Sequence, residues 1–217
     1  MDIDVQAPVD EITPMIKRHG QWQDRGNGHF WLDHVSIDDE GVGRLQSASW
    51  LTLWNVEVPA DFYERLPNLR ELEIDGGSAR HLTPIATATQ VTRLVINQAR
   101  GVFDLAWLAD LDGLESLALF GLPQITTMPS FRRLRKLRFV QVGQMVRLHD
   151  VSGIAEAPAL EELRFTQRLA VTPESMAPFR GHPTLARFGW SWDEGVPVAR
   201  GRAVLDALLL RRPDWNS

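Results

Sequence analysis

Apolar residues recur along the chain in short groups with a common spacing: one apolar residue, a second three positions later, and a third two positions after that. The segments LRELEI, LESLAL, LRKLRF and LEELRF, which begin at Leu69, Leu114, Leu134 and Leu160, all follow this pattern. Looser copies begin at Ala48, Val91 and Leu185, and a further copy begins at Leu32. Alternation of apolar and polar residues at the last positions predicts short strands with one buried face.

The copies are evenly spaced. From Ala48 onward, successive starts lie 21, 22, 23, 20, 26 and 25 residues apart. A strand, a full crossover helix and a return take about 30 residues, so each unit has room only for a strand and a brief helix, a 3₁₀ segment or a turn. Such a unit cannot bury its apolar edge alone, and it stacks on its neighbours. The pattern therefore predicts an α/β repeat protein.

This pattern resembles the leucine-rich-repeat family over roughly residues 32–190. The resemblance implies a curved solenoid of about seven to eight repeats, with a parallel β-sheet on the concave side and short helices, 3₁₀ segments and turns on the convex side. One feature departs from the family, which usually has Asn three positions after the last leucine of each motif. The residues there are Val56, Gly77, Ala99, Leu122, Val142 and Arg168. We expect the turns to be stabilised in another way.

Both ends of an open solenoid need a cover, because they would otherwise expose core and strand edges. Before the repeats, two aromatic-rich segments flank Gly26–Gly28, which predicts a hairpin-like cap. After them, apolar residues near helical spacing between 203 and 210 predict a C-terminal cap helix that ends before Pro213. We divide the chain into an N-terminal cap (1–31), the solenoid (32–192) and a C-terminal cap helix and tail (193–217).

Alternation along each strand predicts which side chains point to the concave face, because neighbouring residues of a strand point in opposite directions. If Leu72 and Ile74 are buried, the concave face includes the residues that we assign to partner binding: Trp50, Trp54, Glu71, Glu73, Asp75, Arg93, Phe120, Lys136, Arg138, Glu162 and Arg164. Exposed large aromatic residues are typical of binding surfaces. The alternative is that Trp50 and Trp54 pack beneath the N-terminal cap.

The charges of this predicted face are ordered along the chain. An acidic stripe of Glu71, Glu73 and Asp75 precedes a basic stripe of Lys136, Arg138 and Arg164. A partner with the opposite order would be oriented by these charges. The alternative is an ordinary solvated sheet face.

Composition and charge argue against several classes of function. The chain has 217 residues, a formal net charge of −5 and no cysteine. The charge gives no support for nucleic-acid binding, and the missing thiols exclude disulfides, thiol catalysis and cysteine metal sites. The acidic N-terminus does not resemble a signal peptide, and apolar runs are too short to cross a membrane. We expect a cytoplasmic protein that is monomeric on its own and does not bind membranes.

Catalytic motifs are missing from the sequence. The six histidines form no metal-binding pair, and we predict no cofactor and no enzyme activity. The carboxylates of Glu71 and Glu73 could act as acid and base in a hydrolase, but an open sheet does little to desolvate them. The favoured hypothesis is a protein-binding module, either a regulator or an immunity-type neutraliser of a toxin. A self-associating structural protein and a carboxylate-dependent hydrolase are the alternatives.

Overall fold

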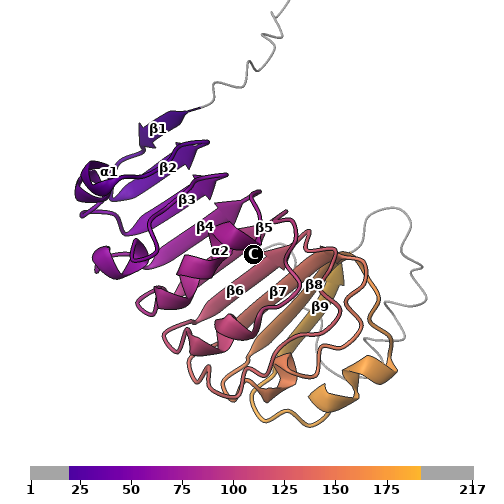
Figure 1. Cartoon of the computed structure of the whole chain (residues 1–217). Coiled ribbons are helices and arrows are strands. Elements are labelled where there is room, and N and C mark those ends of the chain that lie inside the picture. Colours follow the sequence, from indigo (N-terminus) through magenta and orange to yellow (C-terminus); the bar gives the residue numbers. More distant parts are fainter. Residues whose placement is uncertain (1–19, 192–217) are drawn as a thin grey trace, which may run out of the picture.

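The structure is a computed structural model that describes residues 20–191. Nine strands in this part of the chain form one sheet in chain order, and Figure 1 shows them side by side with the short helices along one side of the sheet. The strands are β1 (Gln21–Asp24), β2 (His29–Asp33), β3 (Trp50–Trp54), β4 (Glu71–Asp75), β5 (Arg93–Asn97), β6 (Ser116–Phe120), β7 (Phe139–Met145), β8 (Glu162–Leu169) and β9 (Arg187–Ser191). The connections contain α1 (Asp39–Arg44), η1 (Tyr63–Arg65), α2 (Ala79–Leu82), η2 (Thr83–Thr87), η3 (Ala106–Asp110), η4 (Ile154–Glu156) and η5 (Glu174–Phe179), where η denotes a 3₁₀ helix.

The sheet is parallel from β2 to β9, so each repeat places equivalent residues in register with those of its neighbours. One buried row contains Leu51, Leu72, Leu94, Leu117, Val140, Leu163 and Phe188. The row two residues further along contains Leu53, Ile74, Ile96, Leu119, Val142, Phe165 and Trp190. These rows pack against the connecting segments as one continuous core. The predicted stacking of short repeats is confirmed.

The register predicted for the repeat at Leu134 is wrong by three residues. Leu137, rather than Leu134, is equivalent to Leu114, because Ser116 pairs with Phe139 and Leu117 pairs with Val140. Leu114, Leu137 and Leu160 are then 23 residues apart, and the irregular steps of 20 and 26 disappear. Leu134 and Leu137 are both buried, so apolarity alone could not identify the start of the strand.

The copy predicted to begin at Leu32 is also out of register. Leu32 pairs with Leu53, which is the last apolar position of its motif, and Phe30 pairs with Leu51. The strand of this first repeat is therefore β2, His29–Asp33. The sequence had suggested a strand with Val35 and Ile37 at its buried positions, but these residues follow β2.

The residue directly after each strand from β2 to β6 lies in the left-handed backbone region. These residues are His34, Asn55, Gly76, Gln98 and Gly121, with φ between 49° and 71°. Their N–H groups continue the inter-strand ladder, as in the bond of 2.9 Å from the Gln98 N–H to the Phe120 carbonyl. Gln144 and Gln167 have similar φ angles, within β7 and β8, where the register shifts beyond Gly143. The chain thus turns away from the sheet at nearly the same position in each repeat.

Four of the positions where the family has Asn are filled by packing. Val56, Ala99 and Leu122 are buried there, and in the corrected register the β7 repeat contributes buried Met145; Gly77 is half-buried and Arg168 is exposed. Apolar contacts between neighbouring repeats therefore replace the polar ladder. This explains how the turns are stabilised without asparagine at these positions.

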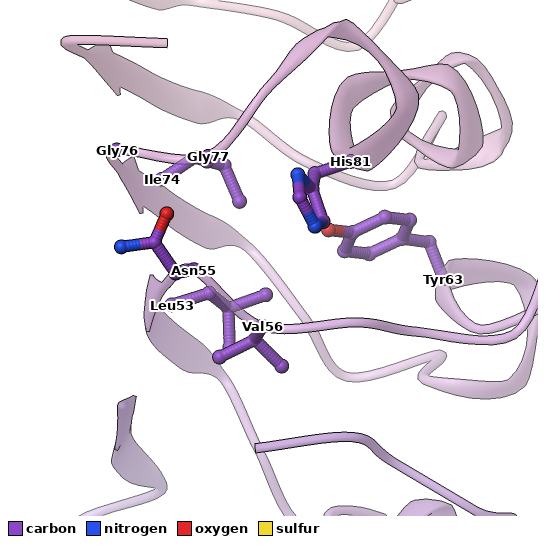
Figure 2. Close-up of a pocket in the computed structure, with 8 residues that line it drawn as sticks. All are labelled: Leu53, Asn55, Val56, Tyr63, Ile74, Gly76, Gly77 and His81. Carbon is purple, nitrogen blue, oxygen red and sulfur yellow. The ribbon is translucent and has the colours of Figure 1, made fainter. Parts of the chain in front are cut away.

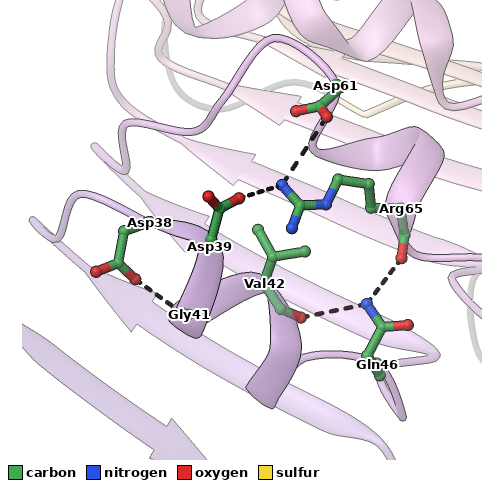
Figure 3. A network of polar contacts seen from close by, with 7 residues as sticks. All are labelled: Asp38, Asp39, Gly41, Val42, Gln46, Asp61 and Arg65. Atoms are coloured by element: carbon green, nitrogen blue, oxygen red, sulfur yellow. Dashed lines mark hydrogen bonds and ion pairs between the residues drawn. The ribbon is translucent and has the colours of Figure 1, made fainter.

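A polar network joins the first two connections on the side opposite the open sheet (Figure 3). The Arg65 guanidinium donates to Asp39 Oδ1 at 2.6 Å and lies 3.9 Å from Asp61 Oδ2. Gln46 Nε2 donates to the Arg65 carbonyl at 2.9 Å. Asp38 begins α1 by accepting a hydrogen bond of 2.8 Å from the Gly41 N–H. These contacts hold η1 against α1 and fix the spacing of the repeats that carry β3 and β4.

The ends of the solenoid are only partly described. The predicted hairpin is present, because β1 and β2 pair antiparallel around the turn at residues 25–28. Its role as a cap, and the division of the chain at residues 31 and 192, stay predictions. The predicted C-terminal helix lies outside the described residues.

Candidate binding surface

Side chains that alternate with the buried rows form the outer side of the sheet, which we call the open face. β2, β3 and β4 place three residues each on it, in register from strand to strand. These nine residues, which we call the Trp–acid patch, are His29, Trp31, Asp33, Trp50, Thr52, Trp54, Glu71, Glu73 and Asp75. Three of them are tryptophans, four carry carboxylates, and none is lysine or arginine.

Aromatic contacts and hydrogen bonds hold the first side chains of the patch in place. The Trp50 ring stacks on the His29 ring, with centroids 3.7 Å apart and planes 3° from parallel. His29 Nε2 lies 3.2 Å from Thr52 Oγ1, and this hydroxyl donates to Glu73 Oε2 at 3.3 Å. Burial, together with the nearby Arg25 guanidinium, lowers the pKa of His29 from its ordinary value. The imidazole is therefore neutral at physiological pH.

The carboxylates of the patch have unequal partners. Glu71 accepts a hydrogen bond of 2.9 Å from the Arg93 guanidinium. Asp75 accepts one of 3.1 Å from Asn97 Nδ2, a neutral donor. Burial raises the pKa of Asp75 from its ordinary value, and burial, followed by repulsion from Asp75, raises that of Glu73. Glu73 and Asp75 are therefore less stable in the fold when both carboxyl groups are ionised.

Trp54 is the most exposed aromatic side chain of the patch, with 44% of its surface accessible. In the strand register, it lies between Asp33 and Asp75. Trp31 is partly covered by the Arg25 guanidinium, 5.3 Å from its ring centroid. Trp50 is half-buried by its stacking on His29. The alternative places both Trp50 and Trp54 beneath an N-terminal cap. Trp54 does not fit this alternative, because its side chain is exposed in the structure of residues 20–191.

The open face of β7 to β9 has a different character. Glu162 is 6% exposed and accepts hydrogen bonds from Arg164 Nε and, at 2.7 Å, from Arg187 Nε. The Arg164 guanidinium also lies over the Phe139 ring, 5.3 Å from its centroid. Glu162 thus orients two arginines and offers little surface of its own to a partner.

Nine of the eleven residues predicted for partner binding lie on the strand positions that were expected: Trp50, Trp54, Glu71, Glu73, Asp75, Arg93, Phe120, Glu162 and Arg164. Lys136 and Arg138 do not, because the corrected register places both before β7. Both are exposed. The Arg138 guanidinium lies 3.4 Å from the carboxylate of Glu161, the residue directly before β8. Of the predicted basic stripe, only Arg164 lies on the open face, where it is paired with Glu162; Arg187 of β9 shares this partner.

Sequence reasoning missed the first strand of the patch and the open-face residues of β7. His29 and Trp31 were placed in a cap, Asp33 was placed in a repeat that began at Leu32 in another register, and Phe139 was placed in the core. The parity of the hairpin could have revealed Trp31, since it alternates with Phe30 and Leu32. Nothing in the local pattern distinguishes Phe139 from a core residue.

Two hollows lie beside the ends of β3 and β4. The first is a cavity of about 10 Å³ next to α2, and Figure 2 shows the residues that line it: Leu53, Asn55, Val56, Tyr63, Ile74, Gly76, Gly77 and His81. This is the lower limit for one water molecule. An open depression beside it is lined by His34, Val35, Ser36, Asn55, Glu57 and His81. Among residues 20–191, no group of three or more side chains is placed to hold a metal ion.

Comparison with known proteins identifies the fold. Internalin C2 of Listeria monocytogenes is 20% identical to this chain, with a TM-score of 0.54 over 76% of this chain and 74% of its own. Internalins are leucine-rich-repeat proteins. The chain has the leucine-rich-repeat fold. Two further structures from this organism match leucine-rich-repeat segments less well: internalin F, at 17% identity and a TM-score of 0.48 over 84% of this chain and 66% of its own, and the functional domain of InlJ, at 10% identity and 0.44 over 80% and 42%.

Two other comparisons do not extend the leucine-rich-repeat assignment. No protein-family model and no curated protein matches the sequence. Within the described part of the chain, no helix has the length and apolar character needed to span a bilayer.

Proposed function

We propose that this leucine-rich-repeat protein is a non-enzymatic binding module that uses its open face to recognise another protein. The observation that carries the proposal is Trp54, a large side chain that is 44% exposed on a sheet whose strands are held in register on both sides. Trp is one of the residue types that dominate binding energy in protein interfaces. The half-exposed Phe120 extends the same row, three strands further along.

The proposed contact surface consists of the Trp–acid patch and the open-face residues that follow it. Arg93 and Phe120 continue it across β5 and β6, and Phe139, Gln141, Arg164 and Arg187 extend it to β9. Glu162 orients Arg164 and Arg187 by accepting a hydrogen bond from each. Lys136 and Arg138 lie at the border, where they would meet only a partner that extends beyond the strand starts.

We further propose that the partner is met inside the cell, where the protein regulates it or neutralises it as an immunity-type protein neutralises a toxin. The sequence observation that supports this is the acidic net charge of −5. A monomer is the proposed state before the partner binds. A hydrolase that uses Glu71 and Glu73 is disfavoured, because the Arg93 guanidinium already occupies Glu71 at 2.9 Å and both carboxylates lie on the open face of a sheet.

The test is affinity capture from the cytosol of the source organism with the immobilised protein. A Trp54→Ala, Phe120→Ala double variant should lose the partner that the wild type captures. Phe103→Ala is the matched control, because Phe103 is 76% exposed in the connection between β5 and η3, off the sheet. Equal capture by the double variant and the wild type would show that another surface binds.

A further inference from the structure

The Trp–acid patch combines two kinds of group that both attract cations. Carboxylates attract them directly, and the faces of tryptophan rings attract them through the ring quadrupole. The nine side chains include four carboxylates and three tryptophans, without lysine or arginine. The patch spans about 10 Å across the strands and about 13 Å along them, from the usual strand spacing and rise. That area matches a few residues of an extended polypeptide segment.

Part of this attraction is already satisfied within the molecule. Asp33 pairs with His34, Glu71 pairs with Arg93 at 2.9 Å, and Trp31 has the Arg25 guanidinium over its ring. The hydrogen-bond donors to Glu73 and Asp75 are neutral, Thr52 Oγ1 and Asn97 Nδ2, and Glu73 is attracted by the Arg93 and Arg25 guanidinium groups only at longer range. Among the described residues, neither carboxylate has an ion pair within 4.0 Å.

Trp54 lies beside these two carboxylates. It pairs in register with Asp75, whose neighbour on the same face of β4 is Glu73. Elsewhere in the described part of the chain, arginine lies over three aromatic rings, those of Trp22, Trp31 and Phe139. Within residues 20–191, no such guanidinium covers Trp54. The ring and the two carboxylates therefore form an arginine-binding arrangement without its arginine.

We propose that the Trp–acid patch docks an arginine-bearing basic segment of the partner protein, with one guanidinium against the Trp54 ring and hydrogen-bonded to the carboxylates of Glu73 and Asp75. The proposal rests on the proposed function and specifies the chemistry of the partner. Arginine fits better than lysine, because its planar guanidinium can stack on an indole and still donate in its own plane to two carboxylates. A guanidinium there would also relieve the repulsion between Glu73 and Asp75.

The probe is a blocked hexapeptide that alternates arginine and glycine, titrated into the full chain by isothermal titration calorimetry. We expect binding at low ionic strength that weakens as salt is added. Trp54→Ala should weaken it about threefold to fivefold, as expected for an exposed cation–π contact. Glu73→Gln with Asp75→Asn should weaken it about tenfold or more, because two charge-assisted hydrogen bonds are lost.

The control variant is Glu64→Gln with Asp112→Asn, which changes the net charge by the same amount at two exposed residues away from the open face. Its affinity should stay within about twofold of the wild type, since these charges are far from the patch and screened. Equal weakening by both double variants would overturn the proposal, because the peptide would then sense only net charge. Absence of binding by the wild type at low ionic strength, or equal binding of a peptide with lysine in place of arginine, would also overturn it.

The outcome is separable from that of the proposed function. If the peptide fails to bind while Trp54→Ala, Phe120→Ala still abolishes capture of the partner, the open face binds a partner of another chemistry. If the peptide binds at the patch while the double variant retains its partner, the captured partner uses another surface. Light scattering tests whether a second copy of this chain occupies the patch instead. A dimer that dissociates in the Trp54→Ala variant would assign the patch to self-association and overturn the proposal.

Discussion

Truncation of Val140 tests the corrected register of β7. Val140 is fully buried and lies between Leu117 and Leu163 in the central row of the core. In the register that the sequence suggested, its side chain would point outward and the Phe139 ring would point inward. Val140→Ala is therefore expected to lower stability strongly in the corrected register and to be nearly neutral in the other.

The magnitude follows from the two buried carbon atoms that are lost. Transfer of these atoms from the core accounts for about 1.6 kcal/mol, at roughly 0.8 kcal/mol for each. The cavity adds about 1 kcal/mol, because the neighbouring strands hold Leu117 and Leu163 in place and limit collapse. We expect the free energy of unfolding to fall by about 2–3 kcal/mol.

The assay is urea denaturation followed by circular dichroism. With a slope of about 2.5 kcal/mol per molar, the midpoint should fall by roughly 1 M. Gln141→Ala is the control, because Gln141 is the next residue of β7 and points to the open face. It should change the free energy of unfolding by less than about 0.5 kcal/mol. A loss below that limit for Val140→Ala, or a larger loss for Gln141→Ala, would refute the register.

Three further predictions concern glycine, the left-handed turn and pH. A Cβ at Gly153 would lie 2.1 Å from the Pro129 carbonyl oxygen, whereas one at Gly43 in α1 meets nothing within 4 Å. Gly153→Ala should therefore lower the free energy of unfolding by about 3 kcal/mol, and Gly43→Ala should raise it by about 0.5–1 kcal/mol. Thermal unfolding of both variants checks this. Gln98 has φ 57°, so Gln98→Gly should stabilise the fold by about 0.5–1 kcal/mol once the greater freedom of unfolded glycine is subtracted; a loss of stability in urea would contradict this. The raised pKa of Glu73 means that the folded state holds this proton to higher pH than the unfolded state, so its contribution to stability falls as pH rises above the ordinary value of 4.5. Glu73→Gln should therefore match the wild type at pH about 4 and melt at a higher temperature at pH about 7, and the reverse order would show that the carboxylate is stabilised in the fold.

The residues of the patch could be predicted only in part. Trp54, Glu73 and Asp75 were found because their strands carry clear apolar markers on the opposite face. Trp31 was missed because β2 is also a strand of the hairpin, which was interpreted as a cap, and Asp33 was missed because the first copy was placed from Leu32 to Ile37. Which carboxylate finds a cation could not be predicted either, because the Glu71–Arg93 pair joins residues on neighbouring strands, 22 positions apart in the chain.

The sequence by itself determined that the chain is a stack of short repeats, since a period in the low twenties leaves no room for full helices. It also determined the side of each strand that is buried wherever leucines alternate with polar residues. Only the tertiary structure decided the register of β7, because Leu134 and Leu137 are both buried, and either could begin the motif. Pairing with β6 and β8 resolves this ambiguity, since a strand can form its hydrogen bonds with both neighbours in only one register. The same pairing brings Trp54, Glu73 and Asp75 together, and among residues 20–191 it leaves the two carboxylates without an ion pair within 4.0 Å.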